Sequence, residues 1–135
     1  MNLKVLRPEG WQRPPGFAYG ISAQGRTVFV SGSLGMDASG KFEAGIAGQT
    51  RQALENILQI LAVDSADANH VVRMSWYVTD MADYRKSQKD VGRAVREVLG
   101  HCDVAMTLVE VRSLIHPDAL VEIEATAVVP ELSAT

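Results

Sequence analysis

His101 and Cys102 stand side by side, and an imidazole next to a thiol is the pairing that a cysteine nucleophile and its general base need. Adjacent residues, however, rarely point so that one activates the other, and the sequence offers no third group to orient the histidine. Cys102 is the only cysteine, so it cannot form an internal disulfide, and it fits a reducing compartment. We therefore do not expect a catalytic cysteine here.

Carboxylates form the second group of candidates. In the segment LVEIEATAVV, Glu122 and Glu124 alternate with Val121, Ile123 and Ala125. In a strand, this alternation places the apolar side chains on one face and the glutamates on the other. Water alone could cover the face that carries the glutamates, and so could a second subunit that meets it around a polar cleft. Both explanations stay open at this point.

These candidates must be positioned by strands and helices. Apolar residues that recur every three or four positions predict a helix over 45–62, and Asp80 and Gly100 delimit a second helix over 81–99. The order β-β-α-β-α-β-β predicts an α+β sheet with both helices on one face. Strands are expected at 18–23, 26–31, 70–80, 103–114 and 120–129, with a further short candidate at 3–6. The strand at 70–80 should carry Val72, Met74, Trp76 and Val78 on one face.

Composition limits the class of protein. The chain has 135 residues, 47% of them hydrophobic, which fits a single domain over 1–135 that buries roughly two-thirds of its unfolded surface. A net charge of -3 with 13 scattered basic residues argues against nucleic acid as a partner. The N-terminus lacks an apolar signal core, and no apolar run approaches the ~18 residues of a membrane span. We expect a cytoplasmic protein that neither enters a membrane nor uses a metal or cofactor.

Several segments have a characteristic order and spacing. They are VFVSGSLGMDASG, QTRQALENILQIL, HVVRMSWYVTDMADY, VEVRSL and LVEIEATAVV. Taken together, they resemble the RidA/YjgF family of small enamine/imine deaminases over roughly 28–129. The resemblance implies a chorismate-mutase-like fold, a homotrimer, and three clefts between subunits that each bind a small acid.

The chain departs from the family at the residue that most defines deamination. Where the deaminating members carry proline, alanine, arginine and a small residue, this chain has Val104, Ala105, Met106 and Thr107. The family arginine clamps the substrate carboxylate, a task that suits a bidentate guanidinium. A thioether offers neither charge nor donors, so binding a carboxylate at Met106 would cost several kcal/mol of lost pairing.

Two other arginines, Arg112 and Arg13, are candidates to replace the family residue. Arg112 continues the face of Met106 along the predicted strand, but six residues at roughly 3.3 Å each place it ~20 Å away. Arg13 lies on a proline-rich arm that could swing toward a cleft, although an arm arginine is usually only solvated. Without a clamp, Met106 and Leu108 would favour a more apolar substrate.

The resemblance assigns further residues to the cleft. Ser31 and Gly32 keep the family's VSG pattern, where a backbone N–H can face a ligand, although a strand-ending turn explains them equally well. Gln88 takes the place of a family asparagine and could instead be a solvated helix residue. Glu122 matches the glutamate that holds the hydrolytic water, a role that suits a carboxylate, or it pairs at a subunit interface. Phe17 and Tyr19 flank the position of a family tyrosine.

Two functions therefore remain open. One is a hydrolase or deaminase that acts on a small imine, enamine or related metabolite in the inter-subunit cleft, with ordinary 2-imino acids as poor substrates because of Met106. The alternative is a non-catalytic trimer that binds a small metabolite or regulates a partner. A third possibility is a trimer whose cleft has been lost, which would have neither function. Fold alone does not decide between them.

Overall fold

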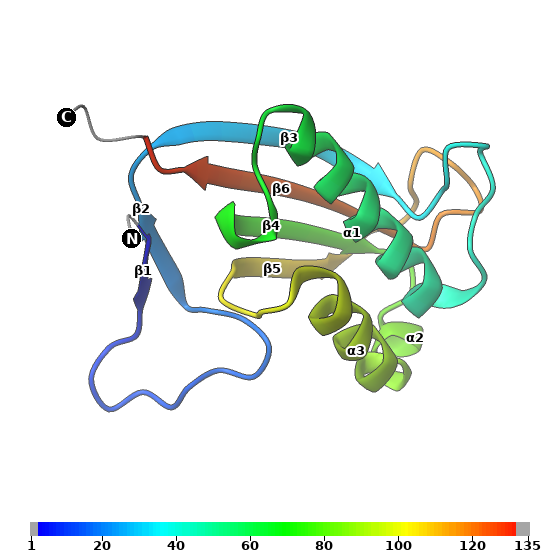
Figure 1. Ribbon diagram of the computed structural model, residues 1–135. Helices are drawn as coiled ribbons and strands as arrows, with labels where there is room; N and C mark the ends of the chain where they lie inside the picture. Colours follow the sequence, from blue (N-terminus) through cyan, green and yellow to red (C-terminus); the bar gives the residue numbers. More distant parts are fainter. Residues whose placement is uncertain (1–2, 132–135) are drawn as a thin grey trace.

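The body of the protein is one four-stranded sheet with its helices on one face (Figure 1). The computed structural model describes residues 3–131. The strand order is β3 (Arg26–Leu34), β6 (Val121–Val129), β4 (Val71–Val78) and β5 (Ala105–Glu110). β6 is antiparallel to both of its neighbours, and β4 and β5 run parallel. The predicted α+β sheet with helices on one face is confirmed.

The first helix, α1 (Gly45–Val63), lies over β3 and β6. Its apolar residues recur at helical spacing, and Ala53, Leu54, Ile57 and Leu61 are almost completely buried. On the sheet side, the alternation along β6 works as predicted, since Val121, Ile123, Ala125 and Ala127 are all buried. The two apolar faces meet and form the core.

The predicted second helix is two helices. α2 (Met81–Lys86) begins at Asp80, whose side chain accepts a hydrogen bond from the Asp83 N–H as expected of a cap. The helix then breaks at Ser87, and α3 (Gln88–Leu99) continues to Gly100, which caps it in the left-handed region at φ 78°. α3 packs chiefly against α1, and a cavity lies between α3 and the strands β4 and β5.

Two strands contain bulges that the sequence pattern did not predict. β3 does not stop at Ser31 but runs on to Leu34, and the register shift between Val30 and Ser33 marks a bulge at Ser31 and Gly32. In β4, the shift between Val71 and Arg73 makes Val72 the extra residue, so the core contains Val71 in its place. Val72 therefore falls outside the predicted alternation, which holds for Met74, Trp76 and Val78.

The N-terminal segment forms a hairpin of its own beside the sheet. β1 (Leu3–Leu6) pairs antiparallel with β2 (Gly20–Ala23), which confirms the short front strand (Figure 1). Between them, an arm returns along β5, where the Ala18 N–H donates to the Val104 carbonyl at 2.9 Å. This contact places Phe17 at the cavity beside α3.

A buried glutamine connects α1 to the loop before β6. Gln49 is 3% exposed, and its amide donates to the carbonyls of Glu43 and Asp118, while its oxygen accepts from the Leu120 N–H at 2.8 Å. Gly35 lies so close to it that an added Cβ would sit 2.4 Å from the Gln49 Cα. The start of β6 is thereby fixed relative to α1 and β3.

Candidate functional site

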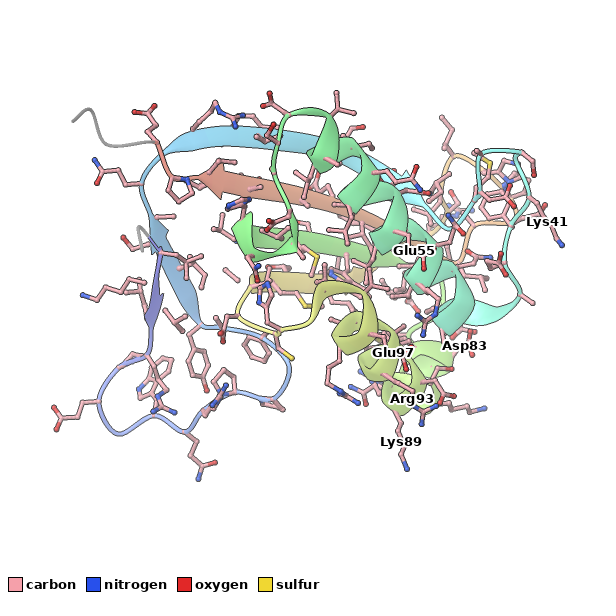
Figure 2. The ribbon with its side chains drawn as sticks, viewed as in Figure 1. Lys41, Glu55, Asp83, Lys89, Arg93 and Glu97 are labelled. Carbon is pink, nitrogen blue, oxygen red and sulfur yellow. The ribbon has the colours of Figure 1, made fainter. Side chains whose placement is uncertain are left out.

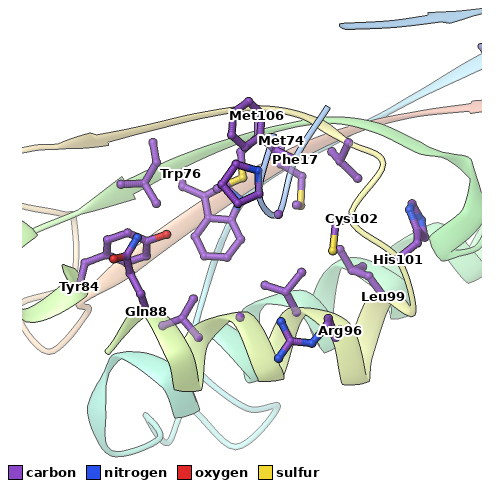
Figure 3. A pocket seen from close by; sticks show the side chains of 17 residues that line it. Phe17, Met74, Trp76, Tyr84, Gln88, Arg96, Leu99, His101, Cys102 and Met106 are labelled. Carbon is purple, nitrogen blue, oxygen red and sulfur yellow. The ribbon is translucent and has the colours of Figure 1, made fainter. Parts of the chain in front are cut away.

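A cavity of about 510 Å³, which could hold a small molecule, lies between α3, β4, β5 and the arm (Figure 3). Four of the residues predicted to form a site line it, namely Phe17, Gln88, Met106 and Leu108. Met106 pairs in register with Met74, and Leu108 with Trp76, so all four side chains lie on the helix side of the sheet. The wall formed by β5 is therefore apolar, as expected from Met106.

Polar groups of the cavity come mainly from the helices. Tyr84 and Gln88 lie near one end, and burial raises the pKa of Tyr84 above its ordinary value, against the opposing effect of a hydrogen bond with Gln88. Arg96, further along α3, also lines the cavity. Trp76 is 1% exposed, and its indole Nε1 has no hydrogen-bond partner among residues 3–131. A buried N–H left unpaired is costly, which makes it a donor available to a bound molecule.

The histidine beside the cysteine is not a general base for it. The His101 Nδ1 accepts a hydrogen bond from the Asp103 N–H at 3.1 Å, and the Nε2 lies 2.8 Å from the Ala68 carbonyl. With the first nitrogen acting as an acceptor, the second must carry the proton that it donates. Both nitrogens are thus engaged by backbone, which agrees with the expectation that Cys102 has no catalytic base.

Three further predicted residues, Ser31, Gly32 and Glu122, lie together on the opposite face of the sheet. The bulge in β3 brings Gly32 against Glu122, since an added Cβ would lie 2.2 Å from a carboxylate oxygen of Glu122. Ser31 lines a separate hollow on this face together with Arg73, Ser75 and Glu124. The Tyr77 hydroxyl donates to Glu124 at 2.9 Å, and this bond raises the pKa of Tyr77. Glu122 is part of none of the ion pairs within residues 3–131.

Within one chain, the predicted site is therefore divided. Met106 and Leu108 face the helices, while Glu122 and Ser31 face away from them across the thickness of the sheet. These two halves cannot contact one ligand inside a single copy. A site that contains both requires the face of one copy to meet the cavity of another.

The other expected residues lie apart from the cavity. Tyr19 is 42% exposed and stacks edge-on against Trp11 and Phe17, so of the two aromatic candidates only Phe17 lines the cavity. Arg13 lines a smaller hollow with Arg7 and Asp103. β5 ends at Glu110, so placing Arg112 on this strand was wrong. Arg112 does not line the cavity, so it is not a replacement for the family arginine there.

Sequence reasoning missed Arg96, and the signal that could have found it is spacing. Gln88, Gly92 and Arg96 are four residues apart on α3 and all line the cavity. Trp76 was expected only to fill the core, and it does so while also lining the cavity. No cluster of three or more metal-ligating side chains occurs among residues 3–131. Over the same range, none of the helices combines the length and apolar character that crossing a bilayer demands.

Comparisons with known proteins cover most of the chain. A family model described as Endoribonuclease L-PSP matches residues 14–129. A RutC family protein of Pyrococcus horikoshii is 35% identical over 127 residues, which span 92% of this chain and 96% of that protein. A protein of Bos taurus named 2-iminobutanoate/2-iminopropanoate deaminase is 41% identical over 61 residues, 44% of each chain.

Solved structures agree with the fold. The structure of YyfB, a protein of the conserved Rid family from Yersinia pestis, superposes with a TM-score of 0.84 at 29% identity and covers 96% of this chain and 100% of its own. A member of the YjgF/YER057c/UK114 family from Mycobacterium tuberculosis gives a TM-score of 0.65 at 36% identity, with 85% and 88% covered.

Proposed function

Because the chain belongs to the RidA/YjgF family, whose matching family model is described as Endoribonuclease L-PSP, we propose that it hydrolyses a small imine or enamine in a cleft between subunits. At the level of the family, imine deamination or a related reaction is supported by relatives named 2-iminobutanoate/2-iminopropanoate deaminase. A net charge of -3 with scattered basic residues argues against RNA as the substrate.

The observation that carries the proposal is the position of Glu122. Its carboxylate lies against Gly32, at the bulge in β3, on the face of the sheet opposite to α1. A carboxylate so placed can accept a proton from a water molecule while the water oxygen adds to the imine carbon. The protonated Glu122 returns this proton to the nitrogen, the hydroxyl of the addition product passes its own proton to the nitrogen as the C–N bond breaks, and ammonia leaves a carbonyl compound behind. An enamine enters the same sequence after protonation at carbon.

The apolar cavity completes the site in this proposal. Met106 and Leu108 of one copy would hold the body of the substrate, and Glu122 of a second copy would supply the water. Because these residues lie on opposite faces of one sheet, the proposal needs self-association, and the family resemblance specifies a homotrimer. Exposed apolar side chains support an assembled state, notably Phe29, 79% exposed, on the strand that carries the bulge.

We expect the protein in solution to have three times the 14.6 kDa mass of one chain. The reason is that the glutamate-bearing face and the cavity can share a ligand only between copies. Size-exclusion chromatography with light scattering at micromolar concentration measures this directly. A stable monomer would remove the shared cleft and, with it, the catalytic role given to Glu122.

The proposed reaction predicts a preference among imines. Imines with an aryl body should be hydrolysed with kcat/KM at least about tenfold above that for 2-iminobutanoate, because a short imino acid leaves the apolar cavity largely empty. Imines generated in place by an amino acid oxidase and trapped with semicarbazide give the rates. Faster turnover of 2-iminobutanoate would contradict the preference, and no turnover of any imine would favour the non-catalytic binding trimer.

A further inference from the structure

An exposed cation lines the cavity on the side formed by α3. Arg96 rises from the last turn of α3 and lines the cavity, as Figure 3 shows. It is absent from the four ion pairs found among residues 3–131. Its neighbour Arg93 differs, because Arg93 pairs with Asp90 at 3.6 Å and points to solvent on the outer side of the helix (Figure 2).

Gly92 makes room for this guanidinium. A Cβ added at Gly92 would lie 3.3 Å from the Arg96 Nη1, so Arg96 folds back along the helix over the glycine. A glycine inside a helix costs up to about 1 kcal/mol relative to alanine. Because Gly92 has no side chain, the Arg96 guanidinium can form this part of the cavity wall.

The indole of Trp76 is the second feature that indicates a ligand-binding cavity. Its indole extends from β4 into the cavity in Figure 3, it is 1% exposed, and its Nε1 has no partner within residues 3–131. The wall between this donor and Arg96 is apolar and includes Val91 and Val95. The cavity thus offers one neutral donor and one cation, separated by hydrocarbon.

We infer that Arg96 is the anion-binding residue of this cavity, and that its ligands are carboxylates with an aryl or branched-alkyl body whose other oxygen accepts a hydrogen bond from Trp76. In this inference the charged group that binds the ligand lies on α3, and not on the sheet, where the Met106 side chain is uncharged. The inference rests on the proposed function only in treating such a ligand as a substrate or product, and binding alone is enough to test it.

The test uses two stable probes of nearly the same shape. The first, 5-oxo-5-phenylpentanoate, has a phenyl body, a ketone oxygen and, three methylene groups away, a carboxylate, and the second, 1-phenylpentan-1-one, replaces the carboxylate by a methyl group. The indole N–H resonances of the assembled protein report binding, since the chain has only two tryptophans, Trp11 and Trp76. We expect the Trp76 resonance alone to shift and the acid to bind about tenfold or more tightly than the ketone.

Arg96→Gln and Arg93→Gln form a matched pair of variants on one helix. Arg96→Gln should abolish the preference for the acid and leave the ketone affinity unchanged, whereas Arg93→Gln should keep the preference. A purely structural role of Arg96 at the end of the helix would change the melting temperature without changing this preference.

Three results would each overturn the inference. They are equal binding of both probes to the wild type, a preference for the acid that survives in Arg96→Gln, and no shift of the Trp76 resonance with either probe. Acid binding as described, without hydrolysis of any imine, would leave the inference standing and refute the proposed function.

Discussion

Glu122→Gln should lower the rate of imine hydrolysis by about a hundredfold or more, because the amide cannot accept the proton of the attacking water. The substitution keeps the size and shape of the side chain, which matters because the end of this side chain occupies the space that a Cβ at position 32 would fill. The melting temperature and the oligomeric mass should therefore stay close to those of the wild type. Steady-state rates with the best imine substrate, measured alongside thermal melts, give both quantities.

Glu124→Gln is the control for this result. Glu124 lies two residues further along β6 on the same face, but its carboxylate accepts a hydrogen bond from the Tyr77 hydroxyl. The amide oxygen of the glutamine in Glu124→Gln can still accept that bond, so we expect less than about a threefold change in the rate of imine hydrolysis. If the two variants lose activity equally, the effect belongs to the charge of the whole face. If Glu122→Gln keeps most of its activity, Glu122 is not the base.

Gly35→Ala should cost about 3 kcal/mol of stability, at the upper end of what overpacking usually costs. The added Cβ would lie 2.4 Å from the Gln49 Cα and 2.6 Å from its carbonyl oxygen, which are backbone atoms of α1 and cannot rotate away. The helix must therefore shift from β3 and take with it the hydrogen bond between Gln49 and the Leu120 N–H. Denaturant unfolding at fixed protein concentration measures the loss.

Gly48→Ala is the companion variant on α1. The new methyl group at position 48 would meet only the Glu43 Cβ, at 3.3 Å, and alanine has the higher helix propensity. We expect stability to change by no more than about 1 kcal/mol, in the stabilising direction if Glu43 yields. A Gly35→Ala variant that unfolds at the same denaturant concentration as Gly48→Ala would mean that α1 and β3 tolerate the closer approach.

Local patterns predicted the fold where burial alone decides the structure. The helix at α1 follows from its apolar period, and the face of Ile123 and Ala125 in β6 follows from alternation. The bulges at Val72 and at Ser31 and Gly32 could not be predicted this way, because a bulge depends on the register of the partner strand. The break at Ser87 was missed because its neighbours are ordinary helix residues.

The site was predictable only in part, for a similar reason. The resemblance selected Met106 and Leu108, and both line the cavity, as does Phe17. It could not select Arg96, since whether a helical arginine faces a cavity depends on how α3 is rotated and how far it stands from the sheet. Nor could one sequence indicate that Glu122 lies on the opposite face from Met106, because that relation depends on which strands are neighbours.

The central place of β6 has a consequence for how the chain is made. In the main sheet β3 pairs only with β6, and β6 pairs on its other side with β4. About 85 residues of chain separate β3 from β6. Until residue 129 has left the ribosome, the nascent chain therefore displays two unpaired strand edges and the apolar side of α1. Such edges invite pairing with other chains. We expect folding to be delayed until synthesis passes this strand, and truncation before Val121 to yield a polypeptide that depends on chaperones or aggregates.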